Sequence, residues 1–263
     1  MFSFVDSTKL DYTKTIINTN LPVYITMTTI PSRFPNTIKI IKHFLNHVTG
    51  FEKIILNIPY KYHRWPHFNV DTSKIDINDS RFMLNRTKDY GPLTKLLGSM
   101  HIIPDDSITI ICDDMCYKLE AFKDIAERQD TFPHKAFSFF VYPYSVDDSP
   151  NKVMVPQGAD LISCYTQNLN HFISWWDSFK HSKGLDRYKD SPCFFVDDQV
   201  IGWYFQSHGI PLEQVDRKHR MIYIKGCDVA NKLDNLNHQV GKNSRENTMS
   251  GCYSQLMSYS PLQ

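Results

Sequence analysis

The sequence lacks an excess of charge of either sign and lacks any long apolar run. Its 29 basic residues nearly balance 28 acidic ones, which gives a formal net charge of +1 over 263 residues. A near-neutral chain has no overall field that would recruit nucleic acid or an anionic membrane. No apolar run reaches bilayer-spanning length, and the first twenty residues do not have the pattern of a signal peptide. We therefore expect a soluble, unsecreted, cytoplasmic protein that has no integral membrane segment and binds no nucleic acid.

Paired cysteine motifs and glycine-rich phosphate loops are also missing. The six cysteines are scattered without a CxxC pair, which in an unsecreted chain favours free buried thiols over disulfides or a zinc site. They are Cys112, Cys116, Cys164, Cys193, Cys227 and Cys252. Neither GxGxxG nor GxxxxGK[ST] occurs, so the dinucleotide-binding and P-loop classes lack their phosphate cradle.

The first half of the chain alternates strand and helix patterns. Strands are predicted at 21–30, 51–58, 81–86 and 107–112, and helices at 36–48 and 91–101. Pro31 and Pro35 are expected to end the first strand, and Asn36 to cap the helix that follows. The order β-α-β-β-α-β predicts an α/β fold with a mainly parallel sheet flanked by helices.

The second half carries more aromatic residues and loops. Its predicted elements are a helix at 118–129, strands at 136–142 and 221–225, an aromatic helix at 169–180, and a polar tail from about 231. Trp175, Trp176 and Trp203 could stack on sugar rings, although packing is the commoner role of aromatic residues on helices. Without a repeat or a low-complexity linker, we expect a single domain, 1–263, with halves at about 20–117 and 118–263.

Two adjacent carboxylates, Asp113 and Asp114, follow the strand at 107–112. Open α/β sheets bind ligands at the carboxyl ends of their strands, so this is an active-site position. Side chains alternate along an extended chain, so Cys112 and Asp114 should point one way and Asp113 the other. Asp114 is the better candidate ligand for Mg²⁺ or Mn²⁺, and Asp113 for a sugar hydroxyl. The alternative is a solvated acidic turn.

A second acidic pair, Asp197 and Asp198, follows the aromatic, strand-like stretch "CFFV" and precedes a helical pattern. Carboxylates are favoured at a helix N-terminus, so capping is one interpretation. The same position suits a general base that accepts a proton from an acceptor hydroxyl.

Two further stretches combine groups that handle nucleotides. "TTIPSR" ends the first strand, and "RTKDYGPLTK" leads into the second predicted helix. Carboxylates can hold ribose hydroxyls, and Arg and Lys neutralise phosphate. The candidate nucleotide-sugar-binding residues, together with Asp113, are Thr28, Thr29, Pro31, Arg33, Asp89 and Lys95.

In this order, the motifs resemble those of GT-A (Rossmann-like) glycosyltransferases, in particular the small ones of large DNA viruses and some bacteria. The matching stretches are "TIPSR", "DYGPLTK", "CDDMCY", "VPQGAD", "VDDQVIGWYF" and the tail from Leu233. The resemblance implies a hexose or deoxyhexose transferred from a nucleotide diphosphate sugar, a UDP-sugar first among them, to a glycan hydroxyl. Gly158 and Asp160 would border the acceptor, and a viral source would place the protein in the host cytoplasm or virion.

The resemblance also implies roles for charged residues. Asp198 is the first choice as the base and Asp197 the second, whereas in a retaining enzyme the pair would position the acceptor. Asp114 and His238 would hold Mn²⁺ or Mg²⁺. The leaving diphosphate would be neutralised with help from Lys95 and from Lys242 or Arg245, the last two of which could equally be exposed tail charges.

One position departs from the family pattern. Cys112 stands where the first aspartate of D-x-D is usual, and a thiol is unsuited to a hard cation. One alternative is therefore a catalytically impaired nucleotide- or sugar-binding protein on the same fold. Another is a nucleotidyltransferase, but the glycine expected after the first strand is missing from "TIPSRFPN".

Overall fold

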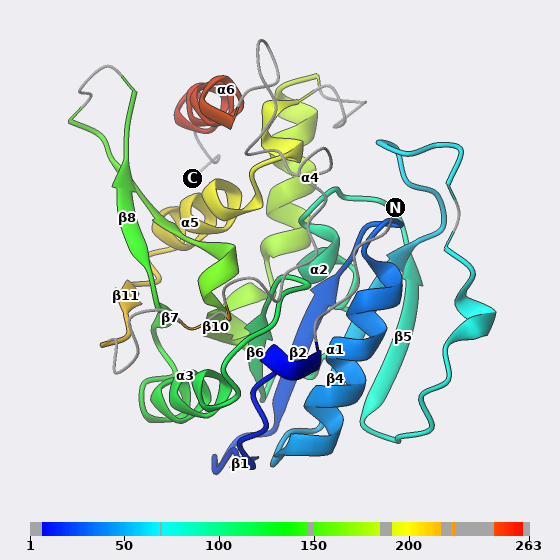
Figure 1. The fold of residues 1–263 in the computed structure, drawn as a ribbon. Helices are drawn as coiled ribbons and strands as arrows, with labels where there is room; N and C mark the ends of the chain where they lie inside the picture. Colours follow the sequence, from blue (N-terminus) through cyan, green and yellow to red (C-terminus); the bar gives the residue numbers. More distant parts are fainter. Residues whose placement is uncertain are drawn as a thin grey trace.

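The computed structural model describes residues 7–68, 70–146, 150–184, 191–216, 222, 224 and 245–259 (Figure 1). Its helices are α1 (Phe34–His47), α2 (Thr94–Leu97), α3 (Glu120–Thr131), α4 (Phe172–Ser182), α5 (Asp197–Ser207) and α6 (Arg245–Met257), with 3₁₀ turns η1 (Ser7–Lys9), η2 (Thr72–Lys74), η3 (Gly158–Asp160), η4 (Thr166–Leu169) and η6 (Pro192–Phe194). Its strands are β1 (Thr15–Ile16), β2 (Val23–Thr28), β3 (Val48–Thr49), β4 (Lys53–Pro59), β5 (Phe82–Thr87), β6 (Ile108–Ile111), β7 (Ala136–Ser138), β8 (Val141–Tyr144), β9 (Val153–Pro156), β10 (Ile162–Tyr165) and β11 (Leu212–Gln214). Within these ranges no helix is both long and apolar enough to cross a bilayer.

A seven-stranded sheet in the order β11-β7-β10-β6-β2-β4-β5 forms the centre of the molecule (Figure 1). The strands β6, β2, β4 and β5 are parallel, and β10 runs antiparallel to both of its neighbours. The predicted α/β fold with a mainly parallel sheet is confirmed. The short strands β8 and β9 form a separate antiparallel pair.

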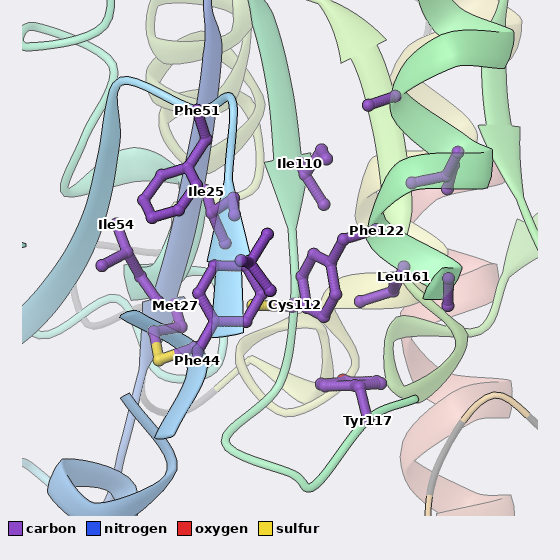
Figure 2. Close-up of a cluster of buried hydrophobic side chains, with 14 of the residues drawn as sticks. Ile25, Met27, Phe44, Phe51, Ile54, Ile110, Cys112, Tyr117, Phe122 and Leu161 are labelled. Atoms are coloured by element: carbon purple, nitrogen blue, oxygen red, sulfur yellow. The ribbon is translucent and has the colours of Figure 1, made fainter. Parts of the chain in front are cut away.

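Helices cover both faces of this sheet. The helices α1 and α3 pack on one face, where Phe44 and Phe122 meet Ile25 and Ile110. Figure 2 shows Cys112 among these side chains. On the other face, α2, α4 and α5 enclose a second cluster that includes Trp175 and Trp176. These two tryptophans are therefore core residues, in line with the commoner role of such aromatics.

Three local predictions were wrong. α1 begins at Phe34 with Pro35 in its first turn, where a missing N–H costs no helical bond, so Asn36 lies inside the helix instead of capping it. The single strand predicted at 136–142 is two strands, β7 and β8, which belong to different sheets. The stretch "CFFV" contains the 3₁₀ turn η6 instead of a strand. The strand predicted at 221–225 lies largely outside the described residues.

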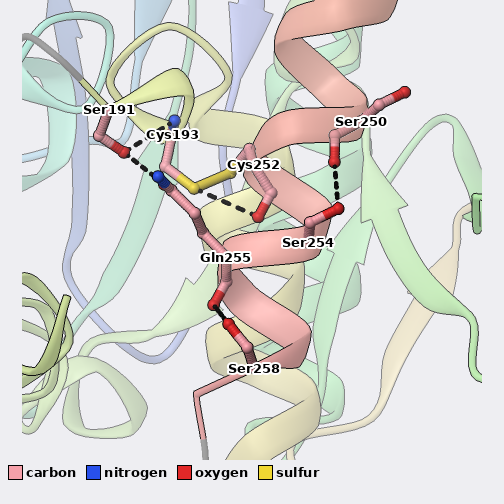
Figure 3. The surroundings of a disulfide bond; sticks show 7 residues. All are labelled: Ser191, Cys193, Ser250, Cys252, Ser254, Gln255 and Ser258. Atoms are coloured by element: carbon pink, nitrogen blue, oxygen red, sulfur yellow. Dashed lines mark hydrogen bonds between the residues drawn. A yellow bond between two sulfur atoms is a disulfide. The ribbon is translucent and has the colours of Figure 1, made fainter.

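Among the described cysteines, the prediction of free thiols is confirmed for Cys112 and Cys164 and is wrong for the other three, and Cys227 lies outside the described residues. Cys193 and Cys252 form a disulfide, which joins η6 to α6 (Figure 3), and Cys116 is also disulfide-bonded. The two partners are 59 residues apart in the sequence, and the packing of α6 on η6 brings them together, which no local pattern predicts.

Candidate functional site

The candidate site lies at the carboxyl edge of the parallel strands. The segments that follow β2, β5 and β6 carry Arg33, Lys95 and Asp113, so the right-handed α/β topology brings them to one edge. β10 runs antiparallel to β6, and its first residue Ile162 pairs with Ile111, the last residue of β6. The turn η3, which precedes β10, therefore reaches the same edge.

Lys95 is the centre of the first group of charges. Its Nζ lies 2.5 Å from Oδ1 of Asp113 and 2.6 Å from Oδ2 of Asp197, and its side chain is only 2% exposed. Burial lowers the pKa of Lys95, but the nearby carboxylates of Asp113, Asp197 and Asp198 outweigh it and raise the pKa well above its usual range. The ammonium group is therefore permanently charged.

A buried polar network fixes the short helix that carries Lys95. The hydroxyl of Thr26 in β2 donates to the backbone carbonyl of Lys95, and Nδ2 of Asn57 in β4 contacts the same carbonyl at 3.2 Å. Asn57 also donates to Oγ of Ser99 at 2.7 Å. Buried amide groups need such partners, so these contacts lock α2 against the sheet. Asn57 escaped the sequence analysis, although a polar residue inside the apolar run "IILNIP" was a signal.

Asp198 stands at the start of α5 beside Gly158. The backbone N–H of Gly158 donates to Oδ1 of Asp198 at 3.0 Å. A Cβ on Gly158 would lie 2.6 Å from that oxygen and 3.0 Å from Nζ of Lys95, so a larger residue would push the Asp198 carboxylate out of this position. Gly202 has a related role, because a Cβ there would lie 2.2 Å from the carbonyl oxygen of Met154 in β9. The close packing of β9 on α5 is what brings Gly158 to Asp198.

Asp198 has a pKa suited to proton transfer. Burial raises its pKa most, and the charge of Asp197 adds to this, while Lys95 and the N–H of Gly158 oppose the increase; together they bring it to about 8. Asp198 is thus mostly protonated at neutral pH and becomes an available base as the pH rises. A general base with a pKa near the working pH is the most effective one.

Asp114 belongs to a second group. Its Oδ1 accepts from Nη1 of Arg33 at 2.9 Å, its Oδ2 accepts from the hydroxyl of Thr29 at 2.6 Å, and its side chain is 7% exposed. Burial raises the pKa of Asp114 against the opposing effects of Arg33 and Thr29. Asp113 reaches α2 on one side of the sheet while Asp114 reaches the start of α1 on the other, so the opposite directions predicted for the pair are confirmed.

The described residues do not fit the predicted metal site. Both oxygens of Asp114 are already bonded, and Cys112 is fully buried with its sulfur 3.7 Å from the carbonyl oxygen of Thr26. Among the residues that the structure describes, no three His, Cys, Asp or Glu side chains are grouped to hold a metal ion. His238 and Lys242 lie outside the described residues. The divalent cation therefore stays a prediction.

The other candidate residues lie around this edge. Asp89 is 6% exposed and accepts backbone N–H groups from His63 at 2.6 Å and Gly91 at 2.8 Å, so its carboxylate ties the loop after β4 to the turn before α2. Thr28 donates to the carbonyl oxygen of Asn57 at 2.8 Å. Pro31 lies in the turn between β2 and α1, and Asp160 is buried in η3. Their ligand-binding roles stay predictions.

Arg245 and Tyr142 complete the charged surroundings. Burial would raise the pKa of Asp113, but the charge of Lys95 lowers it overall, with smaller contributions from Arg33 and from Arg245, the first residue of α6. Burial raises the pKa of Tyr142, the charge of Asp198 raises it further, and a hydrogen bond from Arg245 opposes both. Tyr142 was missed by the sequence analysis, because nothing in the sequence places β8 near α5.

Comparison with known proteins adds similarities of structure only. No protein-family model and no curated protein sequence match the chain. The chain is similar to 4-diphosphocytidyl-2C-methyl-D-erythritol synthase from Anaerococcus prevotii, with a TM-score of 0.46 and 11% identity over 89% of this chain and 96% of that chain. It is also similar to GalNAc-T7 in a structure with UDP, GalNAc and Mn²⁺, with a TM-score of 0.46 and 8% identity over 73% of this chain and 41% of that chain.

These similarities are too weak to assign a family or a reaction. The chain spans less than half the length of the GalNAc-T7 chain. Neither structure is described as viral, so the narrower resemblance to viral enzymes stays a prediction. The fold class therefore rests on the sheet itself, and the case for a function rests on the site.

Proposed function

We propose that the protein is a GT-A-type glycosyltransferase, which transfers a hexose or deoxyhexose from a nucleotide diphosphate sugar to a glycan hydroxyl. The observation that carries this proposal is Asp198, which the N–H of Gly158 holds near the charge of Lys95 at the carboxyl edge of the sheet. Open α/β sheets bind nucleotides at this edge. A UDP-sugar is the first donor to test.

In the proposed reaction, Asp198 is the general base. Its carboxylate takes the proton of the acceptor hydroxyl while the hydroxyl oxygen attacks the anomeric carbon. The bond from that carbon to the diphosphate breaks, and the diphosphate leaves with the electron pair. The proton passes from Asp198 to solvent afterwards. A positioned base of this kind contributes about 10²–10⁴ to the rate.

The donor is proposed to bind where the segments after β2 and β6 meet. Arg33 and Arg245 supply positive charge on this side, and a guanidinium group suits phosphate oxygens. Asp113 keeps a side-chain exposure of 36%, against 7% for Asp114, and is the more accessible carboxylate for a sugar hydroxyl.

One observation favours the alternative of a catalytically impaired binding protein. Cys112 is fully buried, and both carboxylate oxygens of Asp114 already accept hydrogen bonds. Neither position of the usual D-x-D motif therefore offers a free ligand for a metal ion. Such a protein would bind a nucleotide or a sugar and would not transfer it. A nucleotidyltransferase is disfavoured, because the glycine expected after β2 is absent.

The proposed function is tested with a panel of UDP, GDP, CDP and dTDP and their sugars, each with Mn²⁺ and with EDTA. We expect one nucleotide to raise the melting temperature of the protein. The corresponding nucleotide sugar should then release that nucleotide when a glycan acceptor is added. Binding without release would support the impaired protein. The absence of binding to every nucleotide would overturn the proposal.

The cytoplasmic location is still a prediction. Disulfides persist mainly in oxidising compartments, so the Cys193–Cys252 pair favours a location outside a reducing cytosol. Cell fractionation combined with alkylation of free thiols would distinguish a cytoplasmic protein with reduced cysteines from a protein in an oxidising compartment with the disulfide formed.

A further inference from the structure

Lys95 has no room for the role that the sequence suggested. As a phosphate ligand it would need an ammonium group open to the donor, yet its side chain is 2% exposed and already contacts two carboxylates. The position of a Cβ on Gly158, 3.0 Å from Nζ, shows that the turn η3 covers the same atom. The ammonium group is enclosed by protein.

The groups around this ammonium come from separate parts of the chain. Asp113 follows β6, Asp197 begins α5, and Gly158 lies in η3, while Lys95 itself belongs to α2. A buried charge is tolerated only when it is paired, so each of these contacts holds its segment in place. Asp198, the proposed base, is adjacent to Asp197 and bonded to Gly158. Its surroundings are therefore organised around Lys95.

We propose that Lys95 is a positioning residue: its buried ammonium group fixes the two carboxylates beside Asp198 and does not itself bind the donor diphosphate. This inference rests on the proposed function in one respect, the role of Asp198 as the base. The arrangement of the charges around Lys95 does not depend on that function. Positioning and electrostatics act together here, because the ammonium group favours the ionised form of the same carboxyl that it helps to place.

Charged groups of the described residues act on Asp198 in both directions. Beside burial, the charges of Asp197 and Asp113 raise its pKa, and the charge of Lys95 lowers it. Tyr142, which interacts with Arg245, stands on the β8 side. Removing Lys95 should therefore shift the pKa of Asp198 in the opposite direction from removing Asp197 or Asp113. Loss of Lys95 should make Asp198 a poorer base at neutral pH, and loss of Asp197 should make it ionise more readily.

The test is an NMR titration of protein labelled with ¹³C in the aspartate carboxyl groups. The Asp198 signal is the one missing from Asp198→Asn. We expect the midpoint to rise by about one pH unit or more in Lys95→Met and to fall by a similar amount in Asp197→Asn. Lys42→Met, which removes an exposed lysine paired with Asp76, is the matched control and should leave the midpoint unchanged.

UDP affinity separates positioning from phosphate binding. We expect Lys95→Met to keep the wild-type affinity within about threefold. A tenfold loss of UDP affinity in Lys95→Met, with an unchanged titration midpoint of Asp198, would overturn the inference. Lys95 would then be a ligand of the donor diphosphate. If Lys95→Met does not fold, the same two measurements on Lys95→Gln, which also removes the charge, decide the inference instead. If the wild type binds no nucleotide, the proposed function fails, and the midpoints still decide the positioning role.

Discussion

The backbone N–H of Gly158 donates a hydrogen bond of 3.0 Å to Oδ1 of Asp198, and joins a turn before β10 to the start of α5. Because a Cβ on Gly158 would lie 2.6 Å from that oxygen, Gly158→Ala must displace the proposed base. We expect transfer to fall about 10²-fold or more, which is the low end for a misplaced general base. Nucleotide affinity should stay near that of the wild type, as measured by calorimetry.

Gly184→Ala is the control for this change. Gly184 has a φ of +60°, and a Cβ added there would meet no atom of the described residues within 4 Å, so alanine strains the backbone without touching the site. We expect a stability loss of about 1 kcal/mol and unchanged transfer by the folded protein. Equal loss of transfer in both variants would show that general destabilisation, and not the displaced carboxylate, explains Gly158→Ala.

The pairing of Arg33 with Asp114 should stabilise the fold in a pH-dependent way. Arg33→Met leaves the Asp114 carboxylate nearly buried without its ion pair, so its folded-state pKa rises further above the unfolded value. Stability from a raised pKa is present at low pH and is lost as the pH rises through the folded pKa. We expect Arg33→Met to lose about 3 kcal/mol at high pH and much less at about pH 4, as measured by urea unfolding.

A double variant checks the cause of that loss. In Arg33→Met with Asp114→Asn, no unpaired charge is left, so most of the lost stability should return. A double variant that is as unstable at high pH as Arg33→Met would contradict the ion pair as the cause.

Asp198 should leave its own mark on the pH dependence of stability. Its pKa of about 8 in the folded protein lies above the 3.8 of a free aspartate, so the folded state holds a proton that the unfolded state has released. Stability is therefore lost as the pH rises from about 4 to about 8. Asp198→Asn removes this contribution, and its unfolding free energy should fall less steeply over that range. Parallel curves for the two proteins would contradict the raised pKa.

The disulfide between Cys193 and Cys252 should stabilise the packing of α6. It closes a loop with a sequence separation of 59 residues, for which loss of unfolded-state entropy corresponds to about 4 kcal/mol. We expect the variant with both residues changed to serine to melt at a lower temperature than the wild type under oxidising conditions. In dithiothreitol the difference should nearly vanish. A difference that persists in the reductant would mean that the serines, and not the lost bond, lower the melting temperature.

The sequence predicted the elements whose signals are local. The apolar runs of β2, β4 and β6 and the order of strands and helices were enough for the sheet, and the strand ends located Asp113 and Asp114. The sequence could not predict contacts between distant segments. Cys193 with Cys252, and Tyr142 near Arg245, meet only through tertiary packing.

The charged residues show the same limit. Their types and spacing indicated phosphate and metal chemistry, but not which carboxylate each cation would pair with. In the structure Lys95 forms ion pairs with Asp113 and Asp197, and Arg33 forms an ion pair with Asp114. These pairings depend on how α1 and α2 pack on the sheet, which no local pattern encodes.

The most direct test of the central claim compares wild type and Asp198→Asn in one experiment, with UDP affinity measured by calorimetry and UDP release from a UDP-sugar measured with a glycan acceptor. The proposed glycosyltransferase predicts equal affinities and release that is about 10²–10⁴ slower in the variant. Equal rates of release in the two proteins would contradict the account, because Asp198 would then not be the base.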